Sequence, residues 1–195
     1  FAGSLATAFG ALAGGWLVTL LRQAGLTDLA AYRALFGGYA LVGLLLAILA
    51  AFVSPAVETR PAARRDAPAL FFGLHRSRGR VLKLSALYGL DAFAGGFVLQ
   101  SLLVNWFHVR FGADTGLLGS VFFVANLLAA ASAVLAHRIA ARVGLVNTMV
   151  FTHLPSNVLL ILVPLMPSLP LAVGVLLLRF TISQMDVPTR QSYTM

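Results

Sequence analysis

Long uncharged runs of apolar residues, separated by short charged segments, divide the chain. Residues 1–21, 34–57, 115–137 and 143–178 contain no Asp, Glu, Lys or Arg, and residues 84–107 contain only Asp91. A membrane-spanning helix needs about 20 apolar residues, and each run reaches that length. The runs lack the alternation typical of an outer-membrane β-strand, so we expect helices.

The last run is too long for a single crossing. A helix over 143–178 would extend about 54 Å, whereas the hydrocarbon core of a bilayer is about 30 Å thick. Pro164, Pro167 and Pro170 mark the point where the chain turns back. The sequence therefore predicts an all-α, polytopic membrane bundle of six transmembrane helices, at residues 1–21, 32–53, 84–107, 115–136, 145–165 and 170–193.

Composition excludes an ordinary soluble protein. The chain has 195 residues, of which 59% are hydrophobic and 10% charged, and its mean hydropathy is +0.91. Soluble domains average about 45–50% apolar and about 25% charged residues. Cysteine is absent and the four histidines are dispersed, so the sequence predicts no metal site, and no cofactor is expected.

The net charge of +8 mainly indicates how the chain is oriented in the membrane. Seven of the Lys and Arg residues lie in the connection 54–83, and cytoplasmic loops of membrane proteins collect such residues. We therefore expect this connection and both ends of the segment to be cytoplasmic, in a bacterial plasma (inner) membrane. The connection has few aromatic residues for stacking on bases, so no nucleic-acid partner is expected, and membrane lipids are the expected contact.

Two charged residues lie deep within predicted helices. Asp91 is about 10 Å inside the third helix, and Arg179 is about 14 Å inside the sixth, entering from the opposite side. A charge in hydrocarbon is costly and usually faces a cavity or a partner, so these two side chains are candidates for pairing. Arg179, Ser183, Asp186 and Arg190 would share one face of the sixth helix. This stripe predicts a water or substrate path, or alternatively an Asp186–Arg190 ion pair that holds the end of the bundle.

Four weaker polar candidates complete the predicted site. They are Gln100 in the third helix, Asn126 in the fourth, and His153 with Asn157 in the fifth. Buried amides often only bond a neighbouring helix. A histidine can change its charge near neutral pH, or it can be a hydrogen-bonded structural residue. Each of these four residues is therefore either part of the substrate or ion site or a structural residue that bonds a neighbouring helix.

Glycines gather on the first predicted helix. Gly10 and Gly14 form a GxxxG pattern and Gly15 follows, and small residues of this kind let two helices approach closely. The segment from Gly10 to Gly15 also resembles the Gly-Pro-x-x-Gly-Gly motif in the fifth helix of the major facilitator superfamily of secondary transporters. Ala11 stands where that motif has proline.

Two other segments carry the same resemblance. Residues 135–144, with Arg138, Arg142 and Gly144, are similar to the basic loop between the eighth and ninth helices of that family. His137 stands where an acidic residue is usual there. Residues 176–193 are similar to the tenth helix of many bacterial members. The resemblance covers essentially the whole chain, as helices five to ten of twelve.

The resemblance implies an organisation in three parts. Residues 1–53 would be the last two helices of an N-terminal six-helix half, 54–83 a cytoplasmic linker, and 84–195 the first four helices of a C-terminal half. It also implies transport by alternating access, with a small-molecule substrate, protons and the remaining helices of the full-length transporter as partners. Export is a further implication of the glycine motif. Asp91 would be the coupling carboxylate and Arg179 its partner or an anion contact.

Two other classes of function are considered. A non-transporting membrane sensor or assembly subunit would have the same composition, although it would not need a polar stripe. An intramembrane enzyme is disfavoured because the chain has no HExxH zinc motif and no Gly-x-Ser nucleophile motif. We therefore expect a transporter and not an enzyme.

Overall fold

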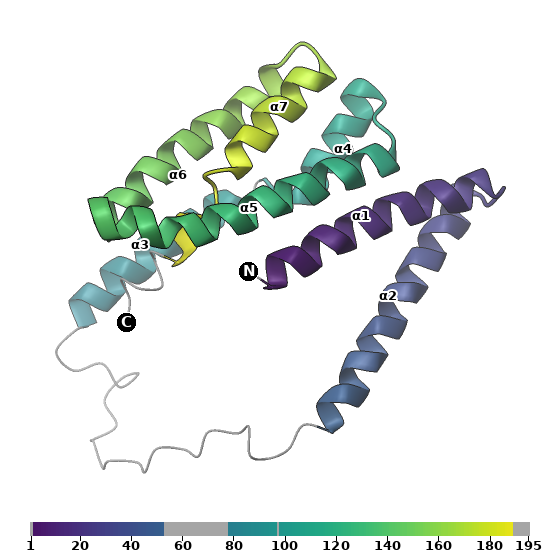
Figure 1. Ribbon diagram of the computed structural model, residues 1–195, viewed down its shortest axis with the longest axis horizontal. Coiled ribbons are helices and arrows are strands. Elements are labelled where there is room, and N and C mark those ends of the chain that lie inside the picture. The colour runs from purple at the N-terminus through teal and green to yellow at the C-terminus, as the bar shows by residue number, and fades with distance from the viewer. Residues whose placement is uncertain (1, 53–77, 97, 189–195) are drawn as a thin grey trace. The chain divides into compact units, whose positions relative to one another are not determined.

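The computed structural model describes residues 2–52, 78–96 and 98–188, and the regular elements in these ranges are all helices (Figure 1). The all-α prediction is confirmed. The helices are α1 (Ala2–Gln23), α2 (Asp28–Ala51), α3 (Arg78–Gly96), α4 (Gln100–Phe111), α5 (Thr115–Val143), α6 (Leu145–Leu162), the 3₁₀ turn η3 (Val163–Leu165) and α7 (Leu169–Phe180).

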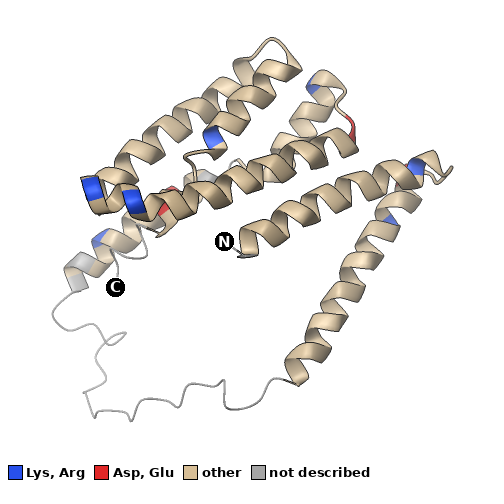
Figure 2. Ribbon diagram, in the orientation of Figure 1, with Lys and Arg blue, Asp and Glu red and all other residues tan. Residues whose placement is uncertain are grey.

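Four of the described helical segments are long and apolar enough to cross a membrane. They correspond to the first, second, fourth and fifth predicted spans, and α7 is a shorter apolar helix. Charged side chains of α1 and α5 lie at helix ends, where they can reach water (Figure 2). This distribution is that of an integral, multi-pass membrane protein. The four segments are Gly3–Gln23, Asp28–Ala51, Thr115–Val143 and Leu145–Leu165.

The structure differs from the prediction at the third and sixth spans. The predicted helix 84–107 is divided, because α3 ends at Gly96 and α4 begins at Gln100. The pair Gly95-Gly96 lowers helix propensity at this point. Helix α3 also begins at Arg78, inside the segment predicted as linker. The rest of that linker, residues 54–77, lies outside the described residues.

The chain divides into two compact units, each of which is described by itself. The first unit comprises residues 1–36 and 104–195, and the second comprises 37–103. In the second unit, the described side chains of α2 beyond Gly37 are all exposed, including Tyr39 and Leu41. Apolar side chains on such a surface suit contact with lipid tails or with further helices.

Helix α5 is the centre of the first unit, where it contacts α1, α6 and α7. Phe122 of α5 and Leu176 of α7 are fully buried between these helices, as is Val18 of α1. At its C-terminal end, Gly144 has a φ of 89° and donates its N–H to Ala140. This left-handed conformation favours glycine, and it reverses the chain directly into α6.

The α1–α5 contact depends on two facing glycines. A Cβ atom on Gly15 would lie 2.5 Å from the Thr115 carbonyl oxygen and 2.8 Å from the Gly119 Cα. A Cβ on Gly119 would lie 2.7 Å from the Ala11 carbonyl oxygen. The two backbones therefore approach too closely for any side chain between them.

Candidate functional site

Helix α7 stops inside the predicted sixth span. It ends at Phe180, and the chain continues as turns through Met185, with hydrogen bonds from Ser183 N–H to the Arg179 carbonyl and from Met185 N–H to the Ile182 carbonyl. The polar residues predicted to share one face of a continuous helix therefore lie on an interrupted segment. Interrupted transmembrane helices are a common place for substrate and ion sites in transporters.

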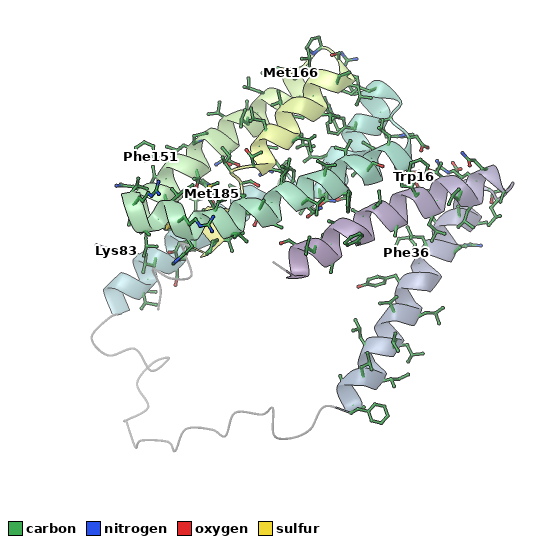
Figure 3. The ribbon with its side chains drawn as sticks, in the orientation of Figure 1. Trp16, Phe36, Lys83, Phe151, Met166 and Met185 are labelled. Carbon is green, nitrogen blue, oxygen red and sulfur yellow. The ribbon has the colours of Figure 1, made fainter. Side chains whose placement is uncertain are left out.

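The interruption brings a carboxylate against α6. Oδ2 of Asp186 lies 3.2 Å from Nδ1 of His153, and the two side chains are 10% and 38% exposed, respectively. Met185, next to Asp186, is also buried (Figure 3). A carboxylate removed from water in this way is stabilised by hydrogen bonds and by an opposite charge. His153 supplies the hydrogen bond and, when protonated, the charge.

The buried side of α6 explains the position of His153. Thr148, Thr152 and Ser156 recur every four residues and are buried. The hydroxyls of Thr148 and Thr152 donate to carbonyl oxygens one turn earlier, at 2.8 and 2.7 Å. Their hydrogen bonds are therefore formed near their own helix and need no partner on another helix. His153 lies at the edge of this buried stripe, which lets its ring reach Asp186.

Arg179 lies in the last turn of α7, directly before the interruption. Its guanidinium interacts electrostatically with Asp186, and the guanidinium carbon lies 5.3 Å from the centre of the Phe180 ring. The side chain is half-buried. Its Nε and the Ser183 hydroxyl are buried and have no hydrogen-bond partner in the described part of the chain. We define the polar cluster as His153, Arg179, Ser183 and Asp186.

Other predicted site residues lie elsewhere. Asn126 donates to the Phe122 carbonyl of its own helix at 2.7 Å, and Asn157 is exposed on α6. Gln100 is exposed at the start of α4. Asp91 is half-buried on α3 in the second unit, so its pairing with Arg179 of the first unit stays a prediction.

Of the predicted stripe, Arg190 lies outside the described residues. The predicted alternative, an Asp186–Arg190 ion pair, therefore stays a prediction as well. Sequence reasoning named both His153 and Asp186 but did not pair them. Helical periodicity could not predict this pairing, because it relates only residues of one helix, and Asp186 and His153 are not on the same helix.

The glycine motif is divided among three environments. Gly15 forms the close contact with α5, Gly14 faces Leu35 of α2, and Gly10 has open space around it. In the basic segment, Arg138 and Arg142 are exposed at the end of α5. Gly144 is the turn between α5 and α6.

A second group of polar residues, not identified from the sequence, joins the start of α5 to the end of α1. Oδ2 of Asp114 accepts hydrogen bonds from the Gly116 N–H at 2.8 Å and from the Thr19 hydroxyl at 2.9 Å. The indole N–H of Trp16, which is labelled in Figure 3, donates to the Ser120 hydroxyl at 2.9 Å. An Asp directly before an apolar helix is typical of an N-cap, so the sequence could have predicted the Asp114–Gly116 bond but not the Asp114–Thr19 bond.

Two opposing effects act on the pKa of Asp114. Burial raises the pKa of this carboxyl group. The hydrogen bonds from Gly116, Thr19 and Thr115 lower it, and so does the positive charge of Arg22. The second group of effects prevails, and the pKa of Asp114 lies below its ordinary value.

No metal site is found in the described ranges. No three His, Cys, Asp or Glu side chains of these ranges gather closely enough to hold an ion. The polar cluster itself offers hydrogen bonding and charge pairing.

Comparison with known proteins identifies the family. The profile of the Major Facilitator Superfamily matches residues 1–195. The chain is 27% identical to an uncharacterized membrane protein of Saccharomyces cerevisiae, over 97% of this chain and 49% of that protein. It thus spans about half the length of this curated relative, and no solved structure matches it. The chain belongs to the major facilitator superfamily.

Proposed function

We propose that the chain is part of a secondary active transporter that moves a small solute by alternating access. Members of its family are transporters and not enzymes. The observation that carries the proposal is the pair formed by Asp186 and His153 at the interrupted end of α7. Ionisable residues within a membrane are expensive to keep, and those that persist mark substrate or ion pathways.

The same pair supports proton coupling. Histidine changes its charge between pH 5 and 8, and a proton on His153 would turn the hydrogen bond to Asp186 into an ion pair. The charged and titratable groups on α5, α6 and α7 are few. Besides the pair, they are Arg179, which interacts with Asp186, and the exposed His137, Arg138 and Arg142 at the end of α5. Arg179 and protonated His153 would compete for one carboxylate, so proton binding would change the charge available in the cluster.

The proposed topology follows from the basic residues. The connection 54–83 would lie in the cytoplasm, together with both ends of the segment. The exposed apolar residues of α2 would then contact lipid or the remaining helices of the full-length protein, which are its expected partners. Export, implied by the glycine motif, is part of the same proposal.

Thiol accessibility tests alternating access without knowledge of the solute. The chain contains no cysteine, so Ser183→Cys in a full-length protein freed of other cysteines would be a unique label site. A membrane-impermeant maleimide should modify it from one side of the membrane at a time, and a pH gradient should change the favoured side. Leu178→Cys is the matched control, because Leu178 is 55% exposed on the apolar surface of α7.

The outcome separates transporter from scaffold. Modification at position 183 from alternating sides, with little reaction at position 178, supports transport. Protection of position 183 from both sides at every pH would indicate a dry contact. A sensor or an assembly subunit would then be the better interpretation.

A further inference from the structure

Two hydrogen-bond donors of the polar cluster have no acceptor within the part of the chain that the structure describes. Nε of Arg179 and Oγ of Ser183 are both buried and unpartnered among the described residues. The Ser183 N–H donates to the Arg179 carbonyl at 3.0 Å, and this spacing of one turn places the two residues on the same side of the chain. A buried polar group without a partner is costly, and a missing ligand is one accepted explanation for it.

The charges around these donors favour a negatively charged ligand. Asp186 is already bonded to His153, and α5, α6 and α7 carry no other Asp or Glu between their first and last residues. A cationic solute would need a carboxylate that these helices do not provide. An anion would accept from both free donors, and the planar guanidinium group suits the two oxygens of a carboxylate or phosphate.

We propose that Arg179 and Ser183 form an anion subsite, and that the transported solute carries a carboxylate or a phosphate group. This inference rests on the proposed transport function and specifies its substrate class. Asp186 interacts electrostatically with Arg179, so the Asp186–His153 pair would adjust the charge of the subsite. A monoanion that travels with one proton would leave the net charge moved across the membrane at zero, which avoids the cost of carrying charge through hydrocarbon.

The test is the thermal stability of the purified full-length protein with four probes. Benzoate, benzylamine and benzyl alcohol have the same ring and differ in charge, and inorganic phosphate is the second anion. A ligand that binds only the folded state raises the unfolding temperature by mass action. We expect benzoate or phosphate to raise it by a few degrees, and benzylamine and benzyl alcohol to leave it unchanged.

Variants assign the effect to the subsite. Arg179→Gln should weaken the apparent anion affinity at least about tenfold, and Ser183→Ala should weaken it severalfold. Arg142→Gln, which removes an exposed arginine at the end of α5, should leave the affinity unchanged. Arg179→Lys keeps the charge without the planar group, and it should retain part of the anion affinity. This variant replaces Arg179→Gln in the experiment if Arg179→Gln does not fold.

Several outcomes would overturn the proposal. They are no stabilisation by either anion, equal or greater stabilisation by benzylamine or benzyl alcohol, and an anion effect that persists in Arg179→Gln and Ser183→Ala. Failure here remains distinct from failure of the transport function. Alternating accessibility of Ser183→Cys without anion binding would refute the subsite alone.

Discussion

Gly15 of α1 and Gly119 of α5 face each other so closely that a Cβ on Gly15 would lie 2.8 Å from the Gly119 Cα. The neighbouring Thr115 carbonyl is nearer still. These obstacles are backbone atoms, which cannot rotate away as a flexible side chain would. The contact therefore defines how near the two helices can come. It also makes Gly15 far more sensitive to substitution than the other glycines of the motif.

Gly15→Ala should lower the stability of the protein, and Gly10→Ala should not. Alanine improves helix propensity by about 1 kcal/mol at either position. At Gly15 this gain is opposed by overpacking, which costs about 1–3 kcal/mol and more where backbone must move. Gly10 has open space, so its substitution is the matched control. Thermal unfolding in detergent measures both, and equal unfolding temperatures for the two variants would show that α1 and α5 do not meet at Gly15.

Asp114 should stabilise the α1–α5 contact in a pH-dependent way. Because the pKa of its carboxyl group is lowered on folding, the stabilisation is complete above the ordinary pKa of aspartate, about 3.9. It is lost as the pH falls through the lower pKa of the folded state. Asp114→Ala removes the N-cap and should cost about 1 kcal/mol at pH 7.

Asp114→Asn separates the cap from the charge. Asparagine is also a good N-cap, so this variant should keep most of the stability at neutral pH. Unfolding temperatures of wild type and Asp114→Asn measured from pH 7 down to pH 3 should converge as the carboxylate becomes protonated. A constant difference over that range would exclude a contribution from the charge of Asp114.

Much of the fold was readable because a bilayer imposes strict lengths on apolar segments. The first, second, fourth and fifth predicted spans appear as helices long enough to cross a membrane. The third and sixth were predicted as continuous, and both are interrupted. The length of an uncharged segment does not show whether the helix within it is interrupted. It depends on local features, such as Gly95-Gly96, whose effect is decided by the surrounding helices.

The candidate site was less predictable than the fold. Asp186 and His153 were each identified as costly polar residues, but their pairing depends on how α6 and the end of α7 pack together. Helical periodicity relates residues of one helix only. The Thr19–Asp114 bond was missed for the same reason, since its two residues are 95 positions apart in the chain.

Removing either member of the Asp186–His153 pair should abolish the pH response of the protein. In the Ser183→Cys background, the alkylation rate is divided by that of a free thiol at the same pH, because the thiolate is the reacting form. This normalised rate should differ between pH 5.5 and pH 7.5, because a proton proposed on His153 would change the charge of the cluster. His153→Gln keeps a hydrogen-bonding side chain without a group that changes charge in this range, so the normalised rate should become independent of pH. Asp186→Asn should have the same effect.

Substitution of the exposed His137 with Gln provides the control for that experiment. It should leave the pH response intact. A pH response that persists in His153→Gln would exclude the pair as the proton site. Asp186→Ala should in addition reduce stability, because it removes the buried carboxylate that bonds His153 at 3.2 Å.

Asp91→Asn tests the carboxylate of the second unit. Asp91 is half-buried on α3, within the third predicted span, where an ionisable residue is a candidate for coupling. If Asp91 carries the coupled proton, its neutral substitute should abolish the effect of an imposed pH gradient on the labelling of Ser183→Cys in vesicles. Asp28→Asn is the control, because Asp28 is an exposed carboxylate paired with Arg22. An unchanged gradient response in Asp91→Asn would remove Asp91 from the mechanism and leave the Asp186–His153 pair as the coupling site.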